Sequence, residues 1–406
     1  MYIKRTGEND LRAALDSGKV VLFLGARQVG KTTLVQEVLK IENVRFLNFD
    51  IEIDKAQFLA AASLSPAEGL RTLGNPNILV LDEAQRLPET ARIVKGWHDA
   101  KIATRILLLG SSSLDLLDQS AESLTGRNRK IVLPPLTFSE ALSSQEWTGT
   151  GLDPSILCEH FAAPLRTFLL QRMAFGSYPE VVLSSDPKRL LRELSSDYLW
   201  KDVLQAGLVK TPNLIRRLLM LLAHQAGNEV SIHELATQLQ MARPTVERYL
   251  ALLEQTFVIF RLPAFSTNPR KEISKSQKVY FWDTGIRNAL LNAFAPDELR
   301  PDIGALWENW VIAEIAKMNL LMSSACELFF WRSRSQAEVD LVVKSGHDLK
   351  AFEIKWTPRR IKSSAFNSAY GVEVSLISPA NPFFAKFLDK SETLELFRQR
   401  TKKGKP

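Results

Sequence analysis

The strongest constraint on the fold is a strand–loop–helix pattern near the start of the chain. The segment VVLFLGARQVGKTTLVQEVL runs from an apolar stretch of strand length, through a glycine loop, into a helical pattern. Its loop matches G-x-x-x-x-G-K-[ST], with Gly25, Gly30, Lys31 and Thr32 at the fixed positions. Glycines let backbone N–H groups curl around phosphate oxygens, and the next helix directs its positive dipole end at the same anion. The sequence therefore predicts a nucleotide-binding α/β domain.

The residues of this loop have separate predicted roles. Lys31 is long enough to reach the β and γ phosphates, and the Thr32 hydroxyl can ligate Mg²⁺. The backbone of the whole loop forms the predicted phosphate cradle, which comprises Gly25, Ala26, Arg27, Gln28, Val29, Gly30, Lys31, Thr32 and Thr33.

A second motif, NILVLDEAQRLP, places two acids after an apolar run. The run is typical of a central parallel strand, and open α/β sheets bind ligands at the carboxyl ends of such strands. We expect Asp82 to hold magnesium through water and Glu83 to orient or deprotonate the attacking water. The alternative is that one of these acids caps a helix and the other lies in its first turn.

Polar residues follow the next apolar run and precede the end of the predicted domain. In TRILLLGSSS, one hydroxyl of residues 111–113 could sense the γ-phosphate, or the serines could form a plain turn. In ESLTGRNRK, Arg127, or else Arg129, is expected near a nucleotide, either its own or that of a neighbouring subunit. An arginine finger is one interpretation. A solvated basic turn is the other.

Four of these segments, GARQVGKTTL, LDEAQ, LGSSS and ESLTGR, resemble the large bacterial and archaeal family of AAA-like ATPases whose C-terminal domain is formally of unknown function. The resemblance covers most of the chain. It implies that ATP and Mg²⁺ are bound and that ATP is hydrolysed by Lys31, Thr32, Asp82 and Glu83. A homo-oligomer, whether a ring or a dimer, is left open.

The middle of the chain predicts a winged helix-turn-helix. In EVSIHELATQLQMARPTVERYLALLEQTFVIFRLP, Ser231 and Glu234 form a capping box for a helix that ends at Leu239. A turn leads to a second helix that ends near Gln255, and the segments FVIFRLP and KVYFWD are expected to pair as strands. The second helix would present Arg243, Thr245 and Arg248 to DNA, with STNPRKEISKSQK as a basic wing. Winged helices also dock proteins, so both interpretations stay open.

The last third carries acids in an order that resembles the core of the PD-(D/E)xK nucleases. An amphipathic helix, GALWENWVIAEIAKMNL, bears Glu308 at the edge of its apolar stripe, and three strand-like segments follow. Asp340 lies on the second of them, while Glu353 and Lys355 are two apart on the third and share a face. In nuclease chemistry Glu308, Asp340 and Glu353 would hold a divalent ion, and Lys355 would stabilise or activate water. The alternative is a cross-strand ion pair on an ordinary hairpin.

Length and composition indicate the class of protein and the number of domains. A chain of 406 residues with 45% hydrophobic and 24% charged residues indicates a globular protein of several domains. We expect an ATPase domain at 1–145, a helical connector at 146–210, the winged helix-turn-helix at 211–290 and a nuclease-like α/β domain with a basic tail at 291–406. Two cysteines, the lack of an apolar signal and of membrane-length runs predict a cytoplasmic protein without a membrane partner.

The predicted function is that of a DNA-associated ATPase. A net charge of +7 favours a polyanionic partner, and DNA is the partner we expect. ATP binding and hydrolysis would be coupled to engagement or remodelling of DNA, including branched or broken duplexes. Two alternatives are an ATP-gated, metal-dependent endonuclease and a nucleotide-dependent switch that docks protein partners.

Overall fold

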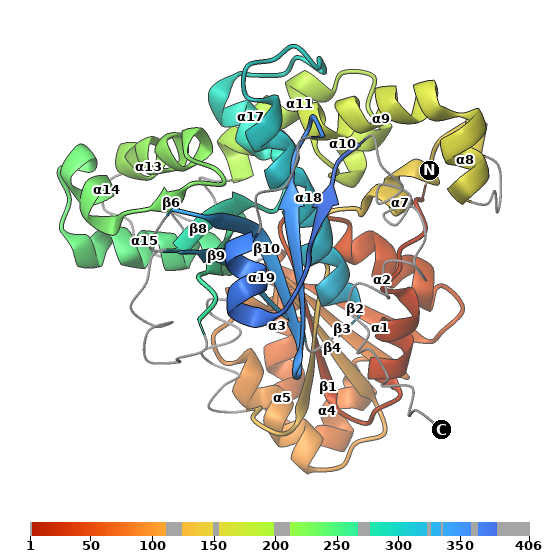
Figure 1. Ribbon diagram of the computed structural model, residues 1–406. Coiled ribbons are helices and arrows are strands. Elements are labelled where there is room, and N and C mark those ends of the chain that lie inside the picture. Colours follow the sequence, from red (N-terminus) through yellow and green to blue (C-terminus); the bar gives the residue numbers. More distant parts are fainter. Residues whose placement is uncertain are drawn as a thin grey trace, which may run out of the picture. The chain divides into compact units, whose positions relative to one another are not determined.

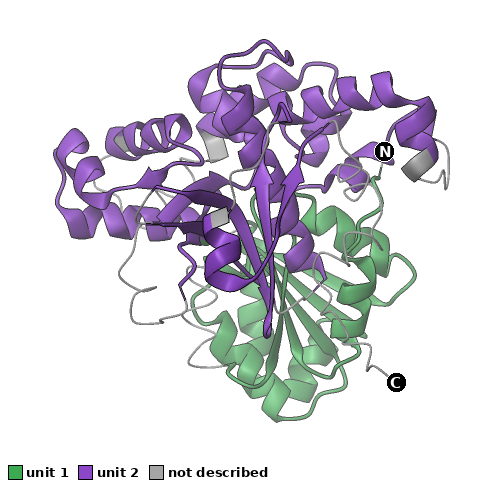
Figure 2. Ribbon diagram, in the orientation of Figure 1, with its two compact units in different colours: residues 1–134, 202–208, 255–257 green, residues 135–201, 209–254, 258–406 purple. Residues whose placement is uncertain are grey.

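The computed structural model describes residues 2–110, 124–148, 154–198, 212–266, 277–322, 326–333, 336–358 and 364–379. These residues form two compact units, drawn in green and purple in Figure 2. The described part of unit 1 lies within residues 1–134, together with 255–257. Unit 2 begins at residue 135 and contains the other described residues.

Unit 1 is a five-stranded parallel sheet in the order β2-β3-β4-β1-β5, with helices on both faces (Figure 1). The described elements of this unit are α1 (Glu8–Leu15), β1 (Val20–Leu24), α2 (Lys31–Leu39), β2 (Val44–Asn48), α3 (Glu52–Ala62), α4 (Pro66–Thr72), β3 (Ile78–Asp82), the 3₁₀ turn η1 (Ala84–Arg86), α5 (Thr90–Asp99), β4 (Arg105–Gly110) and β5 (Asn128–Val132).

The central strands of this sheet are apolar because helices cover both of their faces. Every residue of β1 (VVLFL) and β3 (ILVLD) is buried, as expected for inner strands of a parallel sheet. On one face the strands pack against aromatic residues of α3 and α5, among them Phe58 and Trp97, whose ring centroids lie 5.5 Å apart. This core fixes the strand ends from which the loops of the candidate site emerge.

Unit 2 begins with helices. They are α7 (Phe138–Leu142), the 3₁₀ turn η2 (Glu146–Thr148), α8 (Pro154–His160), α9 (Ala162–Phe175), α10 (Pro179–Leu183), α11 (Pro187–Glu193) and the π-helical turn η3 (Leu194–Tyr198). Helices α9, α10 and α11 occupy the stretch in which apolar residues recur at helical spacing, so the expected helical character of this region is confirmed.

The next part of unit 2 alternates helices and short strands. Its described elements are α13 (Pro212–His224), β6 (Glu229–Val230), α14 (Ile232–Leu239), α15 (Arg243–Gln255), β7 (Ile259–Pro263), β8 (Gln277–Phe281) and α17 (Thr284–Leu291). The three strands form an antiparallel sheet in the order β6-β8-β7. The Ser231 hydroxyl accepts a hydrogen bond from the Glu234 N–H, which is one half of the expected capping box, while the Glu234 carboxylate accepts a hydrogen bond from the Gln238 side chain. Between α14 and α15, Gln240 adopts the left-handed conformation with φ 53°.

The last part of unit 2 is a four-stranded sheet in the order β12-β11-β10-β9. It contains α18 (Ile303–Leu321), β9 (Glu327–Arg332), β10 (Glu338–Ser345), β11 (Asp348–Ile354), α19 (Ser364–Tyr370) and β12 (Val374–Ile377). Strands β9, β10 and β11 form an antiparallel meander, and β12 returns parallel to β11. A bridge from Ala264, just past β7, to Phe330 of β9 joins this sheet to the three-stranded one.

Helix α18 is buried on all sides, so the expectation of an amphipathic helix with one apolar stripe is wrong. The apolar residues of the stripe, such as Trp307 and Ile315, are buried, but so are Asn309, Glu314 and Lys317. Sequence periodicity could not reveal this, because each of the polar side chains is buried against a specific partner.

One of these buried polar pairs anchors the start of unit 2. The Glu314 carboxylate accepts a hydrogen bond of 2.8 Å from the N–H of Phe138 and one of 2.7 Å from the Lys317 ammonium. Lys317 also donates to the carbonyl of Leu136 at 3.0 Å. Burial raises the pKa of Glu314, and the Lys317 charge opposes this effect. Helix α18 therefore holds a segment that lies far upstream in the chain.

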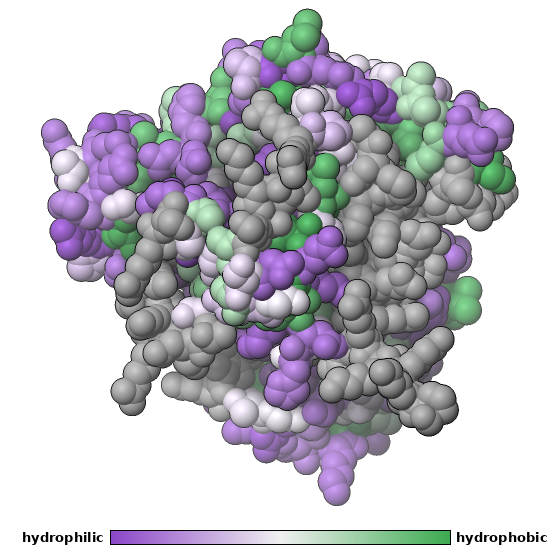
Figure 3. All heavy atoms as spheres, viewed as in Figure 1, coloured by the Kyte–Doolittle hydropathy of each residue, from purple (hydrophilic) through white to green (hydrophobic). Residues whose placement is uncertain are grey.

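The surface of the described residues carries isolated apolar side chains such as Ile41 and Leu299, which are 85% and 89% exposed. On the coloured part of the face in Figure 3, apolar residues are scattered among hydrophilic ones. None of the helices described here combines the length and apolar character needed to cross a membrane.

Candidate functional site

The glycine loop of unit 1 joins the end of β1 to the start of α2. Gly25 has φ 155°, and a Cβ atom at this position would lie 2.3 Å from the carbonyl oxygen of Leu133. Any other residue would clash with this backbone, so the loop needs glycine in order to pass beside the chain that follows β5. Gly30 is the N-cap of α2 and has φ 89°, so the loop leads directly into the first turn of this helix.

Lys31 begins α2, and its side chain folds back into the loop. Its side chain is buried, and its ammonium donates hydrogen bonds of 2.8 Å to the carbonyls of Gly25 and of Ala26. The positive charge is thus held within the curl of the loop. An anion bound there would meet both this charge and the dipole of α2.

The next residue of α2 faces the carboxyl end of β3. The Thr32 hydroxyl donates a hydrogen bond of 2.8 Å to Oδ2 of Asp82, and the other carboxylate oxygen accepts the N–H of Glu83 at 2.9 Å. A hydroxyl and a carboxylate oxygen thus lie side by side at the mouth of the loop. Hard oxygen ligands of this kind suit Mg²⁺, which binds through a few protein oxygens and keeps several waters. The residues present fit the expected ion.

Glu83 follows β3 in a strained backbone conformation. Its φ is 51°, in the left-handed region that residues other than glycine rarely adopt, and its carboxylate accepts a hydrogen bond of 2.6 Å from Gln85. Burial raises the pKa of Glu83, while the positive charges of Lys31 and Arg27 oppose this effect. A carboxylate with a raised pKa, held in a fixed place beside a phosphate cradle, is suited to accept a proton from water.

Arg5 supports the loop from outside, and sequence reasoning missed it. Its guanidinium is buried and donates to the carbonyl of Val29 at 2.8 Å and to that of Pro134 at 2.7 Å. Val29 belongs to the glycine loop, and Pro134 lies just after β5. Arg5 therefore ties the loop to the sheet through two charge-assisted hydrogen bonds, although it lies in a segment without a recognisable motif.

The structure corrects the expected place of Arg127. It precedes β5, whose residue Asn128 pairs with Val20 at the amino end of the parallel strand β1. The glycine loop lies at the other end of β1, the carboxyl end. Because β1 has five residues and a strand rises by roughly 3.3 Å per residue, the loop is about 16 Å from the end at which Arg127 lies. Arg127 instead contacts Asp99 at 2.6 Å, so it does not approach a nucleotide bound by its own chain.

In unit 2, α15 bears the residues expected to contact DNA. Arg243 and Arg248 are exposed, and Thr245 is partly buried. Arg243 lies 2.9 Å from a ring nitrogen of His233. The basic segment expected as a wing is mostly outside the described residues, as are the serines at 111–113.

The start of β10 and the end of β11 hold a pair of acids that share a lysine. Oδ2 of Asp340 accepts hydrogen bonds of 2.7 Å from the Lys355 ammonium and from the N–H of Ile354. The same ammonium lies 2.9 Å from the Glu353 carboxylate. Burial raises the pKa of Glu353, and the charge of Asp340 raises it further. The expected convergence of these three side chains is present.

Glu308 approaches the same region but has other partners. Its Oε1 accepts hydrogen bonds of 2.7 Å from the Tyr280 hydroxyl and 3.2 Å from the Lys278 ammonium. Burial raises the pKa of Glu308 to about 7, although Lys278 acts in the opposite direction. Sequence reasoning placed Lys278 at the end of the basic wing and Tyr280 on the strand KVYFWD, and it missed the contact of both residues with Glu308; Lys278 is buried and so does not lie on an exposed wing. Their spacing of two residues on that strand was the available signal.

Glu308 thus has partners other than the pair of acids at Lys355, and the expectation that Glu308, Asp340 and Glu353 share a divalent ion stays a prediction. Among the residues described, no group of three or more His, Cys, Asp or Glu side chains is arranged to hold a metal ion. Acids brought together in a buried place need positive charge beside them. Here Lys355 and Lys278 supply that charge.

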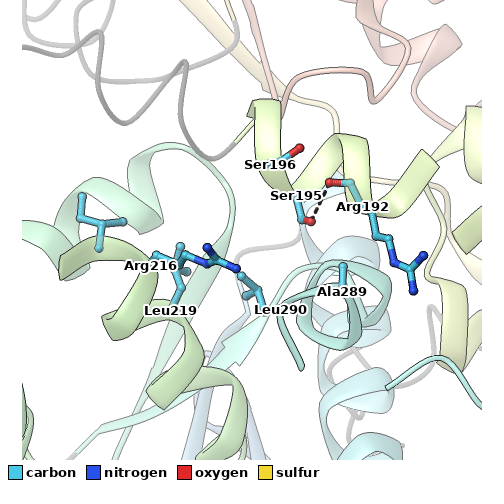
Figure 4. Close-up of a pocket in the computed structure, with 8 residues that line it drawn as sticks. Arg192, Ser195, Ser196, Arg216, Leu219, Ala289 and Leu290 are labelled. Carbon is cyan, nitrogen blue, oxygen red and sulfur yellow. Dashed lines mark hydrogen bonds between the residues drawn. The ribbon is translucent and has the colours of Figure 1, made fainter. Parts of the chain in front are cut away.

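A separate hollow of about 260 Å³ lies in unit 2 between α11, η3, α13 and α17. Its lining includes Arg192, Ser195, Arg216 and Leu290, and Figure 4 shows the Arg216 guanidinium extending toward Leu290. The Ser195 hydroxyl donates a hydrogen bond of 3.1 Å to the carbonyl of Arg192. None of the residues predicted from the sequence to form a site lines this hollow.

Three family models match successive parts of the chain. Residues 17–142 match an AAA domain, residues 166–297 match a domain of unknown function (DUF8612), and residues 303–381 match another domain of unknown function (DUF4143). The AAA match contains the glycine loop and the acids that follow β3.

Similar proteins occur in bacteria and archaea. An uncharacterized protein of Mycobacterium tuberculosis is 31% identical over 375 residues, which cover 90% of this chain and 77% of that protein. An uncharacterized protein of Methanocaldococcus jannaschii is 27% identical over 351 residues, or 82% of this chain and 74% of that protein. Among solved structures, a Walker-type ATPase of Pyrococcus abyssi superposes with a TM-score of 0.52 at 16% identity, covering 71% of this chain and 96% of that one. This likeness shows an AAA-type P-loop fold.

Proposed function

The chain belongs to the same family as the uncharacterized mycobacterial protein and carries an AAA domain, and from this premise we propose that it binds and hydrolyses ATP. The observation that carries the proposal is the joint placement of Lys31, the Thr32–Asp82 pair and Glu83 around one glycine loop. Their position at the loop and at the end of β3 supports the proposal.

The residues would divide the reaction as follows. Lys31 exchanges its loop carbonyls for phosphate oxygens, and the N–H groups of the loop and of α2 hold the same phosphates. Thr32 and Asp82 would hold Mg²⁺, which supplies charge neutralisation at the phosphates. Glu83 orients a water molecule and accepts its proton, for which a raised pKa is suited.

Two substitutions separate binding from hydrolysis. Lys31→Ala removes the positive charge from the phosphate cradle and is expected to abolish binding of a fluorescent ATP analogue. Glu83→Gln should retain that binding while the rate of phosphate release falls by about 10²–10⁴-fold, as is typical when a positioned base is lost. Lys40→Ala is the control, because Lys40 lies at the end of the same helix and pairs with Glu37 on the surface. A Glu83→Gln protein that hydrolyses ATP at the normal rate would refute the role of Glu83.

We further propose that unit 2 engages DNA. Support comes from the order helix, strand, helix, helix, strand, strand from α13 to β8, which is that of a winged helix. In such a fold α15 would be the recognition helix, and its exposed Arg243 and Arg248 would contact phosphates. The alternative, in which this surface docks a protein partner, predicts no effect of DNA on ATP hydrolysis.

The DNA proposal is tested by binding and by ATP turnover. Duplex, single-stranded or branched DNA should raise the ATPase rate, and affinity should fall steeply with salt. Changing Arg243 and Arg248 together to Ala should flatten the dependence of log K on log salt by roughly one unit for each phosphate that the variant no longer neutralises. Arg189→Ala is the control, since Arg189 is 71% exposed and lies on α11. Unchanged affinity in the folded double variant would remove α15 from the interface.

The endonuclease alternative receives mixed support. The order α18, β9, β10, β11, α19, β12, with β12 parallel to β11, is that of a nuclease-like core. Lys355 beside Asp340 and Glu353 belongs to that pattern, but Lys278 argues against cutting, because it occupies the Glu308 carboxylate that a metal would need. We therefore propose that this part of unit 2 contributes to holding DNA and does not cut it. Mn²⁺-dependent cleavage that Asp340→Ala abolishes would contradict this proposal.

We propose that the chain forms a homo-oligomer, a ring or a dimer, in which any nucleotide that Arg127 contacts is bound by a second copy. The residue is 39% exposed, and its partner Asp99 is also on the surface, so the pair can open at little cost. Sedimentation of the Glu83→Gln protein with ATP tests for a ring or a dimer. If Arg127→Ala leaves both assembly and ATP turnover unchanged, Arg127 is a solvated basic residue.

A further inference from the structure

The most unusual charged group in unit 2 is the buried ammonium of Lys278. This residue lies on β8, and its side chain is only 3% exposed. Its nitrogen lies 2.5 Å from Oε1 of Glu338 and 3.2 Å from Oε1 of Glu308. Removing an ammonium from water costs several kcal/mol unless opposite charges compensate it. The two carboxylates provide this compensation.

The acids around Lys278 come from two other elements. Glu308 lies on α18, whereas Glu338 and Asp340 lie near the start of β10. The negative charges of all three favour the protonated form of Lys278. Two carboxylate oxygens within hydrogen-bonding distance of one nitrogen need only small side-chain movements to converge on a metal ion, whose oxygen ligands lie at about 2.0–2.6 Å.

Two features hold Lys278 in this place. The fully buried amide of Asn309, next to Glu308, accepts the N–H of Phe281 at 3.0 Å and donates to the carbonyl of the same residue at 2.8 Å, so α18 cannot slide along β8. Gly227, with φ 85°, lets the chain pass so close to Glu308 that a Cβ atom would lie 3.1 Å from Oε1. The contact between Lys278 and Glu308 is therefore built into the packing of β8 against α18.

We propose that the Lys278 ammonium takes the place of a divalent cation among Glu308, Glu338 and Asp340, and that it prevents this cluster from binding one. Lys278 thereby determines which cation the cluster accepts. The inference does not depend on ATP hydrolysis, because both the charges and the contacts lie within unit 2.

The test is to replace the lysine with an uncharged side chain of similar length. Full-length Lys278→Met is titrated with Mn²⁺ in the absence of nucleotide, and free Mn²⁺ is followed by electron paramagnetic resonance. We expect one ion per chain, bound at least about tenfold more tightly than by the unchanged protein. Mn²⁺ should also raise the Tm of the variant and leave that of the unchanged protein in place.

The control for a general loss of positive charge is Lys344→Met, because Lys344 forms an exposed pair with Glu327 at 2.6 Å. It should acquire no Mn²⁺ site. Adding Asp82→Asn to Lys278→Met should leave the new site intact, whereas adding Asp340→Asn should weaken it. Disappearance of the new site with Asp82→Asn would assign the ion to the glycine loop and overturn the proposal.

A second variant covers the case in which Lys278→Met does not fold because its acids repel one another. Lys278→Met with Glu338→Gln carries one negative charge fewer and keeps Glu308 and Asp340. If the folded variants bind Mn²⁺ no better than the unchanged protein, the proposal is wrong. It is also wrong if the unchanged protein binds Mn²⁺ in unit 2 as tightly as Lys278→Met does. Neither result bears on ATP binding, which is measured separately with Lys31→Ala.

Discussion

Arg5 offers a sharp test of how the glycine loop is held in shape. Arg5→Met keeps most of the length of the side chain but removes the donors to the carbonyls of Val29 and Pro134. Hydrogen bonds to a charged group contribute about 1.5–3 kcal/mol each, so removing two should destabilise unit 1 by about 3 kcal/mol or more. For a domain of this size that corresponds to a fall in Tm of about 10 °C.

The effect on ATP turnover should differ from the effect of a catalytic substitution. Arg5 contacts the outside of the loop and no group that we place on the reacting atoms. A loosened loop has to be ordered when nucleotide binds, so KM for ATP should rise by about tenfold while kcat at saturating ATP changes little. Melting curves and steady-state ATPase rates measure the two effects independently.

Two comparisons make the Arg5 result decisive. Arg12→Met is the control, because Arg12 is exposed on α1, and it should leave both Tm and KM unchanged. Arg5→Lys retains the charge but not the forked geometry, so it should fall between the other two proteins. If Arg5→Met has the Tm and KM of the unchanged protein, the buried guanidinium does not support the loop and our reasoning fails.

Two further predictions concern the stability of unit 2. Burial alone would raise the pKa of Asp302, but hydrogen bonds from Arg300 and Arg287 outweigh it and lower the pKa to about 2. The contribution of the ionised Asp302 carboxylate to the free energy of unfolding is therefore fully present above about pH 4, and it is lost as the pH falls toward 2. Asp302→Asn should lower Tm at pH 7 and flatten its decline over that range; an unchanged profile would contradict the assignment. Gly227→Ala should lower Tm through strain at φ 85° and the 3.1 Å approach to Glu308, whereas Gly304→Ala in α18, with open space around it, should not. If the two alanine variants have the same Tm, the close approach of Gly227 to Glu308 does not affect stability.

The sequence was most informative where one local segment makes a whole structural unit. The glycine loop needs only a strand, a turn and a helix that are contiguous, so Lys31 and Thr32 could be placed from their spacing alone. The same holds for α14 and α15, whose ends are marked by Ser231 and by the residue in the left-handed conformation at Gln240.

The sequence was least informative where distant segments meet. Lys278 and Glu308 are 30 positions apart. The spacing of Lys278 and Tyr280 indicates that these two residues share a face, but neither segment indicates that this face meets Glu308. Arg127 illustrates another limit. Its place in the chain, after the third apolar run, predicted a nucleotide contact. Because β5 runs parallel to β1, however, Arg127 lies at the amino ends of these strands, and the glycine loop lies at the carboxyl end of β1. A local sequence pattern predicts a helix or a strand, but the pairing register of the neighbouring strands decides which side chains lie close together.

The anchoring of Phe138 and Leu136 by α18 bears on how the chain is made. Their partners on α18 lie 176 and 181 residues downstream, so these bonds cannot form until most of the protein has left the ribosome. Contacts between distant segments close slowly, because a long loop must be ordered first. The sheet of unit 1 lies within residues 1–134, so it can form while unit 2 is still being synthesised, and residues 255–257 join unit 1 later. A truncation placed before α18 would therefore leave the start of unit 2 without its anchor, and the shortened chain would expose apolar surface to proteases and chaperones.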